Sequence, residues 1–199
     1  MKQMEAYTRH GRKGHRVQVL LCDRSGGSMM CSGGFEVASS PVVCLAKAID
    51  DQPAIIVIHF PEGAIQEREV LVELCDVLKR TSPTRDKPLL ALLPTRHRKL
   101  LEKLDQARVD YVKFITALPL DLPHVTCMIE SLGPGDLLKR QLERVCPFIH
   151  YSPIDTEREI IICGAYLDRL VLGSKCLHAI CESETHLRCE YFRNPKVSS

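Results

Sequence analysis

The stretch Gln52-Pro53-Ala54-Ile55-Ile56-Val57-Ile58-His59 decides the fold class. It is a continuous apolar run rich in β-branched residues, which is the pattern of a central parallel strand buried on both faces. Similar short runs lie at residues 17–22, 35–38, 89–93 and 111–115, and segments with helical periodicity lie near 41–50, 64–80, 95–107 and 123–132. This alternation predicts an α/β fold, a doubly wound parallel sheet with helices on its faces and ligand chemistry at the carboxyl ends of the strands.

The composition is that of an ordinary folded domain. The chain has 199 residues, of which 45% are hydrophobic and 26% charged, and its formal net charge is +2. This balance excludes wholesale disorder and gives no overall field for nucleic acid or an acidic membrane. No apolar run approaches the roughly 18 residues of a membrane span. The polar, basic residues 1–16 lack the apolar stretch of a secretory signal. We therefore expect a cytoplasmic protein without a membrane segment.

Changes in composition divide the chain into expected parts. They are a basic N-terminal arm at residues 1–15, an α/β domain at 16–132, a linker helix at 133–145, a cysteine-rich module at 146–192 and a tail at 193–199. Within the module, short strands are predicted at 159–162 and 169–172, and a short helix after Ser174. The module is too small to be stable through apolar burial alone, so it either docks on the α/β domain or is held by a metal.

The 10 cysteines are the main chemical clue. In the cytoplasm they are expected to be reduced thiols or metal ligands, because disulfides are rare there. Four of them lie within apolar faces and are interpreted as core thiols: Cys22, Cys44, Cys75 and Cys127. The glycine-rich residues 25–34 lack the spacing of a phosphate-binding or dinucleotide-binding loop and are interpreted as a connector.

Four further cysteines are candidate metal ligands, namely Cys146, Cys163, Cys181 and Cys189. Their spacing matches no standard zinc or iron–sulfur pattern, but each lies on a different expected element, and the last two bracket a polar turn. Four thiolates suit Zn²⁺ or an Fe–S cluster, between which the sequence does not decide, and their softness excludes Mg²⁺ and Ca²⁺. Four reduced cysteines without a metal are the other interpretation.

Two residues are alternates for this ligand set, Cys176 and His186. Cys176, at the start of a short helix, is otherwise interpreted as a core thiol. His186 and His178 are otherwise interpreted as surface residues or as supports for the ligands.

Several strings in the α/β domain share the order and lengths of a known family. They are Asp23 after the first strand, Gly34-Phe35-Glu36-Val37, Ala46-Lys47-Ala48-Ile49-Asp50, the stretch that ends at His59, and Ala107-Arg108-Val109-Asp110-Tyr111-Val112. Over about residues 16–132 they resemble the receiver domain of bacterial response regulators. The resemblance implies a flavodoxin-like five-stranded sheet. It also implies a chemistry in which an aspartate at the end of the third strand accepts a phosphoryl group with the help of Mg²⁺.

Most residues of that chemistry are replaced here. His59 stands where the family has its phosphoacceptor, and Asp23 is all that is left of the acidic cluster, a poor oxygen set for Mg²⁺. Thr95 lies two residues beyond the position of the family's hydroxyl residue, and Lys113 matches its lysine only with an offset. We expect a degenerate site that is not phosphorylated on aspartate and binds no Mg²⁺. His59 is interpreted as a packed histidine, with phosphoryl acceptance or a pH switch as alternatives.

The end of the chain carries a second resemblance. Its strings are Cys146-Pro147, Cys163-Gly164-Ala165, Cys181-Glu182-Ser183 and His186-Leu187-Arg188-Cys189-Glu190-Tyr191-Phe192. Over about residues 146–192 they are similar to a cysteine-rich module of bacterial signalling and conserved uncharacterised proteins. This resemblance implies a metal or iron–sulfur site without deciding which.

Together these features predict a non-catalytic signalling or regulatory protein with a protein partner and a structural or redox-sensing cysteine site. The alternative is a small redox or cofactor-binding protein, or an enzyme, that uses the strand-end crevice near Asp23 and His59. Nucleic-acid binding is not expected, because the basic runs at 9–16 and 96–99 lack interleaved aromatic residues. These runs are interpreted as a solvated terminus and a solvated helix face. A homodimer is a further possible arrangement, since receiver-like domains often pair through one helical face.

Overall fold

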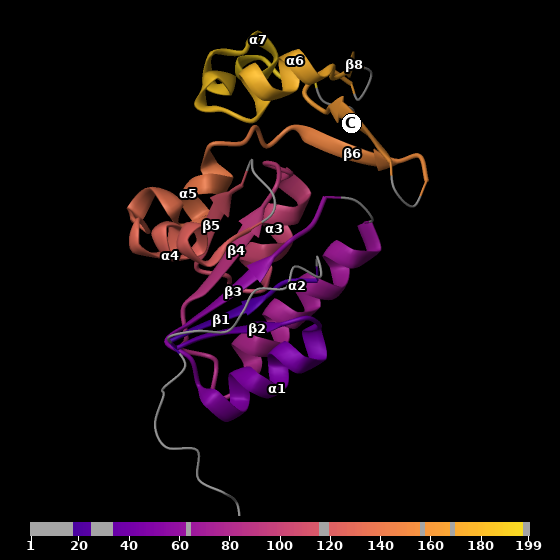
Figure 1. The fold of residues 1–199 in the computed structure, drawn as a ribbon. Coiled ribbons are helices and arrows are strands. Elements are labelled where there is room, and N and C mark those ends of the chain that lie inside the picture. The colour runs from indigo at the N-terminus through magenta and orange to yellow at the C-terminus, as the bar shows by residue number, and fades with distance from the viewer. Residues whose placement is uncertain are drawn as a thin grey trace, which may run out of the picture.

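The computed structural model describes residues 18–24, 34–62, 65–115, 120–155, 158–167 and 170–196. The basic arm at 1–15 and most of the glycine-rich connector lie outside the described residues. Figure 1 shows two parts of the protein: a parallel sheet with its helices, and a C-terminal segment that lies at one end of this sheet.

A five-stranded parallel sheet forms the centre of the protein. Its strands are β1 (Val19–Cys22), β2 (Phe35–Ala38), β3 (Ile55–His59), β4 (Leu89–Leu93) and β5 (Tyr111–Phe114), in the order β2-β1-β3-β4-β5. Every residue of β3 and β4 is buried, which explains their unbroken apolar sequences. The predicted α/β class with a flavodoxin-like five-stranded sheet is confirmed.

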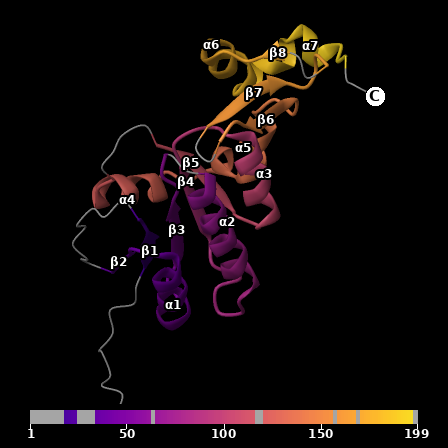
Figure 2. The ribbon, with the colours of Figure 1, turned by 90° about the vertical axis from the view of Figure 1, so that its right-hand side faces the viewer.

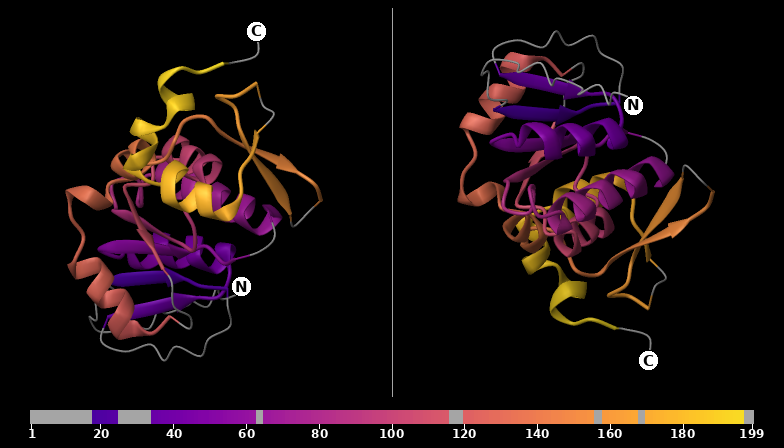
Figure 3. Two further views of the ribbon diagram at one scale, coloured as in Figure 1. Left: turned by 90° about the horizontal axis from the view of Figure 1, so that it is seen from above. Right: turned by 90° about the horizontal axis from the view of Figure 1, so that it is seen from below.

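Helices cover both faces of this sheet. α1 (Pro41–Asp51), α2 (Ile65–Arg80) and α3 (Arg98–Gln106) pack on one face, and α4 (Leu122–Glu130) packs on the other (Figure 3). Local sequence sets the helix starts. Ser40 and Asp121 accept hydrogen bonds from the first turns of α1 and α4, and a proline follows each of them in the first turn.

The C-terminal segment holds a second, smaller sheet. After η1 (Pro134–Asp136) and α5 (Leu138–Glu143), an antiparallel sheet forms from β6 (Ile149–Pro153), β7 (Glu159–Cys163) and β8 (Leu170–Val171). Short helical turns follow: α6 (Ser174–Cys176), η2 (Leu177–Cys181), η3 (Glu184–Arg188) and α7 (Glu190–Arg193). η2 is a π-turn, in which the amide of Glu182 donates to the carbonyl of Leu177 at 2.9 Å.

The C-terminal segment docks on the α/β part and does not form a core of its own. Leu138, Val145, Ile149 and Leu177 belong to the same buried cluster as the side chains between the sheet and α3. His97, which follows the carboxyl end of β4, contacts β6 and β7, so the segment stands at the carboxyl-end edge of the parallel sheet (Figure 2). Of the two routes to stability that the sequence left open, docking is present.

Within the described ranges, no helix is long and apolar enough to cross a membrane.

A buried lysine ties α2 to the amino ends of two strands. The Lys79 ammonium donates to Asp110 Oδ2 at 2.6 Å and to the Lys87 carbonyl at 2.9 Å, and the amide of Leu89 donates to the same carboxylate oxygen at 2.8 Å. Lys79 is 8% exposed, so its charge depends on these acceptors.

Replacing Asp110 with alanine should therefore lower the free energy of unfolding by about 2–3 kcal/mol, because it removes the charged acceptor that a buried ammonium and a strand amide share. Urea denaturation measures the change. Asp76→Ala is the matched control, because Asp76 pairs with the exposed Arg80 in an i,i+4 contact whose loss should cost at most about 0.5 kcal/mol. Equal losses in the two variants would contradict the prediction.

Candidate functional site

A buried aspartate–histidine pair lies at the carboxyl ends of β1 and β3. Asp23 directly follows β1 and His59 ends β3, and the two strands are neighbours in the sheet. Nδ1 of His59 lies 2.8 Å from Oδ1 of Asp23, and the residues are 2% and 5% exposed. Doubly wound sheets bind ligands where their strand order reverses, which is between these two strands. Here the two ionisable side chains at that point are bonded to each other and leave little surface for a ligand.

The other two residues of the expected receiver site have different surroundings. Lys113 is in register with Leu92, which is in register with His59, so Leu92 stands between them in the row across the sheet. The Lys113 ammonium lies 2.9 Å from a carboxylate oxygen of Asp136 in η1. Thr95 is exposed in the turn after β4. The structure thus joins the aspartate to His59, whereas Lys113 binds another carboxylate and Thr95 faces solvent.

Three of the four cysteines expected in the core are there. Cys22, Cys44 and Cys75 are fully buried, but Cys127 is exposed on α4, which turns Met128 toward the sheet instead. The expectation for Cys127 was wrong, because the face of α4 that meets the sheet carries Val125 and Met128, and Cys127 lies outside that face. A hydrogen bond between the first two thiols lowers the pKa of Cys22 and raises that of Cys44, and burial raises the pKa of Cys75. These thiols are enclosed structural groups.

The four candidate ligands come from four separate elements. Cys146 follows α5, Cys163 ends β7, Cys181 ends the π-turn and Cys189 precedes α7. The amide of Cys146 donates to the carbonyl of Cys181 at 2.7 Å. Cys163 pairs in register with Ile149, three residues beyond Cys146. The first three are buried and Cys189 is partly exposed. Cysteines spread over more than 40 residues of sequence are thereby gathered in one region of the C-terminal segment.

The charges of these thiols influence one another. Burial raises the pKa of Cys146, and the neighbouring Cys163 and Cys189 raise it further. Burial also raises the pKa of Cys181 to about 12, and the other three cysteines of the set contribute. Cys146 and Cys181 are therefore protonated at neutral pH, and a metal that bound them would have to displace their protons.

The chemistry of the four thiols favours a metal site, but their present geometry does not form one. Four thiols are the right chemistry for Zn²⁺ or an Fe–S cluster. Within the described part of the chain, however, no three His, Cys, Asp or Glu side chains stand close enough together to hold an ion. The four sulfurs are neighbours and not a closed cage, so an ion would be held only after they moved closer together.

Steric contact explains why the residue after Cys163 is a glycine. The imidazole of His150 lies against Gly164, and a Cβ added there would be 2.6 Å from Cε1 of that ring. Glycine at this position therefore allows β6 and the end of β7 to approach closely, which places Cys163.

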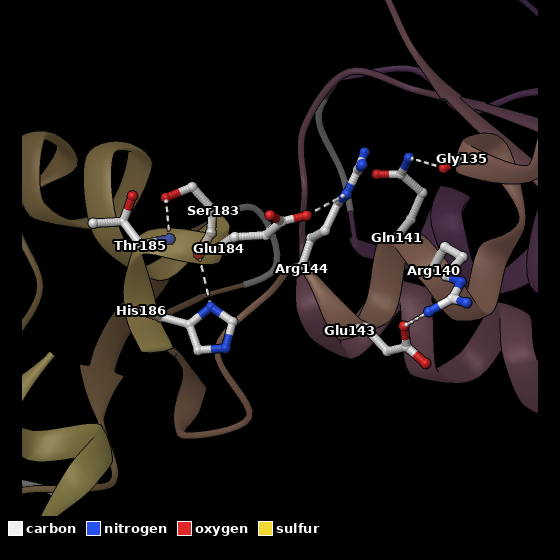
Figure 4. A network of polar contacts seen from close by, with 9 residues as sticks. All are labelled: Gly135, Arg140, Gln141, Glu143, Arg144, Ser183, Glu184, Thr185 and His186. Carbon is white, nitrogen blue, oxygen red and sulfur yellow. Dashed lines mark hydrogen bonds and ion pairs between the residues drawn. The ribbon is translucent and has the colours of Figure 1, made fainter. Parts of the chain in front are cut away.

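The alternates for the ligand set differ in their surroundings. Cys176 is exposed, so its interpretation as a core thiol was wrong. His178 is an exposed residue that pairs with Glu182 at 2.7 Å. His186 is 2% exposed, and its Nδ1 lies 2.7 Å from the carbonyl of Ser183 (Figure 4). His186 thus belongs to the interior of the segment.

Sequence reasoning missed the junction between the two parts. The run at 96–99 was interpreted as a solvated helix face, yet His97 caps α3 and stacks on Tyr151 with ring centroids 3.7 Å apart. Nε2 of His97 lies 2.9 Å from Oε2 of Glu159. The Arg98 guanidinium donates to the Val145 carbonyl at 2.5 Å. Their partners lie about 50 residues or more away in sequence, and β6 was not predicted, so no local pattern could reveal these contacts.

Comparison with known proteins does not extend these observations. No protein-family model matches the chain, and no curated protein matches it.

His97, at the contact between α3 and the C-terminal segment, makes the stability of the protein depend on pH. Nδ1 of His97 accepts from the Leu100 amide, so the folded protein uses the neutral imidazole. Burial lowers the pKa of His97 below its usual value near 6.5, although Glu159 acts in the opposite direction and Arg68 adds to the lowering. Below about pH 6.5 the unfolded state therefore binds more protons than the folded state. The stability that the contacts of neutral His97 provide is thus fully present above that pH and is lost as the pH falls toward the lowered pKa of His97.

We expect the free energy of unfolding to fall between about pH 6.5 and pH 5, with a slope of up to about 1.4 kcal/mol per pH unit from this residue. Urea denaturation across that range measures it. His97→Gln should flatten the slope, and His178→Gln, at an exposed histidine, should not. An unchanged slope in His97→Gln would refute the assignment to this residue.

Proposed function

We propose that this protein is a non-catalytic regulatory protein of a signalling pathway, with a receiver-like α/β part and a metal or iron–sulfur site at Cys146, Cys163, Cys181 and Cys189. The observation that carries the proposal is the gathering of four thiols from four elements on the docked C-terminal segment. Cysteine is a small apolar side chain in a core, but thiols that raise one another's pKa are costly to ionise and are stabilised as thiolates by a metal.

The proposal of a non-catalytic role rests on the strand-end pair. A phosphoryl acceptor or a general base needs an atom that a substrate can reach. Asp23 and His59 are each at most 5% exposed and are bonded to each other, and Lys113 is bound to Asp136. Since Mg²⁺ needs several oxygen ligands, one buried carboxylate that already holds an imidazole supports neither magnesium binding nor transfer to aspartate.

Metal binding would connect the cysteine site to the parallel sheet. Zn²⁺ would act there as a structural cross-link, and an Fe–S cluster would add sensitivity to oxidation. Cys146 directly follows Val145, whose carbonyl accepts from Arg98 at the start of α3. A shift of the chain at Cys146 on metal binding would therefore be passed to the carboxyl ends of the parallel strands through the hydrogen bond between Val145 and Arg98. A protein partner that recognises this edge would respond to the state of the thiols, and a second copy of the chain is one such partner.

One observation favours a second candidate function. The aspartate–histidine pair lies where the strand order reverses, the position at which this fold class binds ligands. A small redox or cofactor-binding protein, or an enzyme, would use this point. The burial of both side chains favours the regulatory proposal.

Purification without oxygen tests the cysteine site. We expect either about one zinc ion per chain or iron with acid-labile sulfide and broad visible absorption. Cys189→Ser should lower the metal content by at least about half, because it removes one of four ligands while changing a partly exposed position. Elemental analysis and the visible spectrum are the measurements.

The matched control for that experiment is Cys127→Ser, since Cys127 is an exposed thiol on α4 outside the set. It should keep the full metal content. A wild-type protein without metal, or equal losses in both variants, would overturn the metal part of the proposal.

Treatment with acetyl phosphate and Mg²⁺ tests the non-catalytic part. We expect no phosphoprotein by intact mass spectrometry, because the strand-end pair is buried and its members are bonded to each other. A single added phosphoryl group that disappears in His59→Gln or Asp23→Asn, but persists in His178→Gln, would revive phosphotransfer at this site.

A further inference from the structure

A groove of about 460 Å³ runs along the junction of the two parts. Its apolar walls are made by Leu142, Val145, Pro147, Leu187 and Phe192, which come from the α5 region on one side and from η3 and α7 on the other. Grooves of this size that are mainly apolar and lie between two structural units are common sites for small ligands. The metal proposal makes no use of this groove.

A buried histidine is one of the residues that line the groove. His186 lines the groove and is 2% exposed. Its Nδ1 lies 2.7 Å from the Ser183 carbonyl, which can only accept, so the ring proton is on Nδ1 and Nε2 is left as an acceptor. Figure 4 shows the ring with its second nitrogen turned away from Ser183. Among the described residues, Nε2 has no hydrogen-bond partner.

The His186 ring is held in this orientation by an aromatic neighbour. Its plane and that of Phe192 meet edge to face, at 82° and with centroids 5.0 Å apart. Phe192 also lines the groove. The imidazole acceptor and an aromatic wall are thus fixed next to each other before any ligand arrives, which reduces the entropy cost of binding.

The charges around the groove are balanced. Two cations, Arg98 and Lys139, and two anions, Asp105 and Glu143, line it. Arg98 already donates to the Val145 carbonyl, and Glu143 is paired with Arg140 at 2.9 Å. The groove therefore offers no excess charge to an ionised ligand, and its surroundings suit a neutral one.

We propose that this junction groove binds a small, neutral, apolar or aromatic molecule that carries one hydroxyl or N–H group, which donates to Nε2 of His186. The ligand would contact the α5 region and α7 together, so it would stabilise the docked position of the C-terminal segment. Since Val145 and Pro147 flank Cys146, the ligand would lie beside the cysteine site without being held by a thiol.

Three benzene derivatives serve as matched probes: phenol, toluene and benzoate. Phenol carries the donor, toluene has the same shape without it, and benzoate replaces it with a negative charge. Shifts of backbone amides in ¹⁵N-labelled full-length protein locate and quantify binding. We expect phenol to move the amides of Leu142, Val145 and Leu187, with affinity about five- to tenfold above that of toluene, the contribution of one hydrogen bond. Benzoate should bind no better than toluene.

Two variants separate recognition by His186 from simple burial in the groove. His186→Phe keeps a ring but removes the acceptor, so phenol should fall to the affinity of toluene. Leu187→Trp changes a wall residue that is 54% exposed, which keeps the fold, and should weaken phenol and toluene alike by narrowing the groove. His178→Gln is the control at an exposed histidine and should change neither.

The proposal is overturned if phenol moves no amides of the groove, if toluene binds as tightly as phenol in the wild type, or if benzoate binds more tightly than phenol. The same measurements on metal-free and metal-loaded protein keep the two proposals distinguishable, because the groove should bind phenol in both.

Discussion

The contact between the start of α3 and the C-terminal segment is the constraint on which the rest of the arrangement depends. A segment of this size buries too little apolar surface to fold alone. It is stable here because its buried side chains continue the core between α3 and the sheet, and because His97 and Arg98 satisfy groups on β6, β7 and the chain after α5. The position of the cysteines, and of the groove beside them, follows from this docking.

The α/β part was predictable because its signals are local. The unbroken apolar runs of β3 and β4 are what burial on both faces requires, and each expected strand of the parallel sheet agrees with the structure to within about two residues. β6 was missed because His150, Ser152 and Pro153 interrupt its apolar pattern. A strand on a docked edge needs only one buried face, and Pro153 at its end costs no pairing inside the sheet.

The candidate site was predictable only in its parts. The four thiols could be named from their positions in the sequence, but their relative placement depends on docking, on the close approach at Gly164 and on a turn of unusual geometry. Cys127 and Cys176 show the opposite error, since an apolar neighbourhood in sequence does not say which face of a short helix is covered. The roles of His97 and Arg98 were hidden because a basic run is solvated unless its partners arrive from distant strands.

The π-turn over Leu177–Cys181 sets where one of the four thiols points. A π-turn contains one more residue per hydrogen-bonded ring than an α-turn, and each residue of a helix advances by about 100° around its axis. An extra residue in such a turn shifts the side chains that follow it around the helix axis, and the carbonyl of Cys181, at the end of the turn, accepts from the amide of Cys146. The four cysteines thus supply the chemistry of this site, whereas the number of residues in the turn sets where their side chains lie. A one-residue deletion in the turn would therefore move the thiols apart without removing any of them.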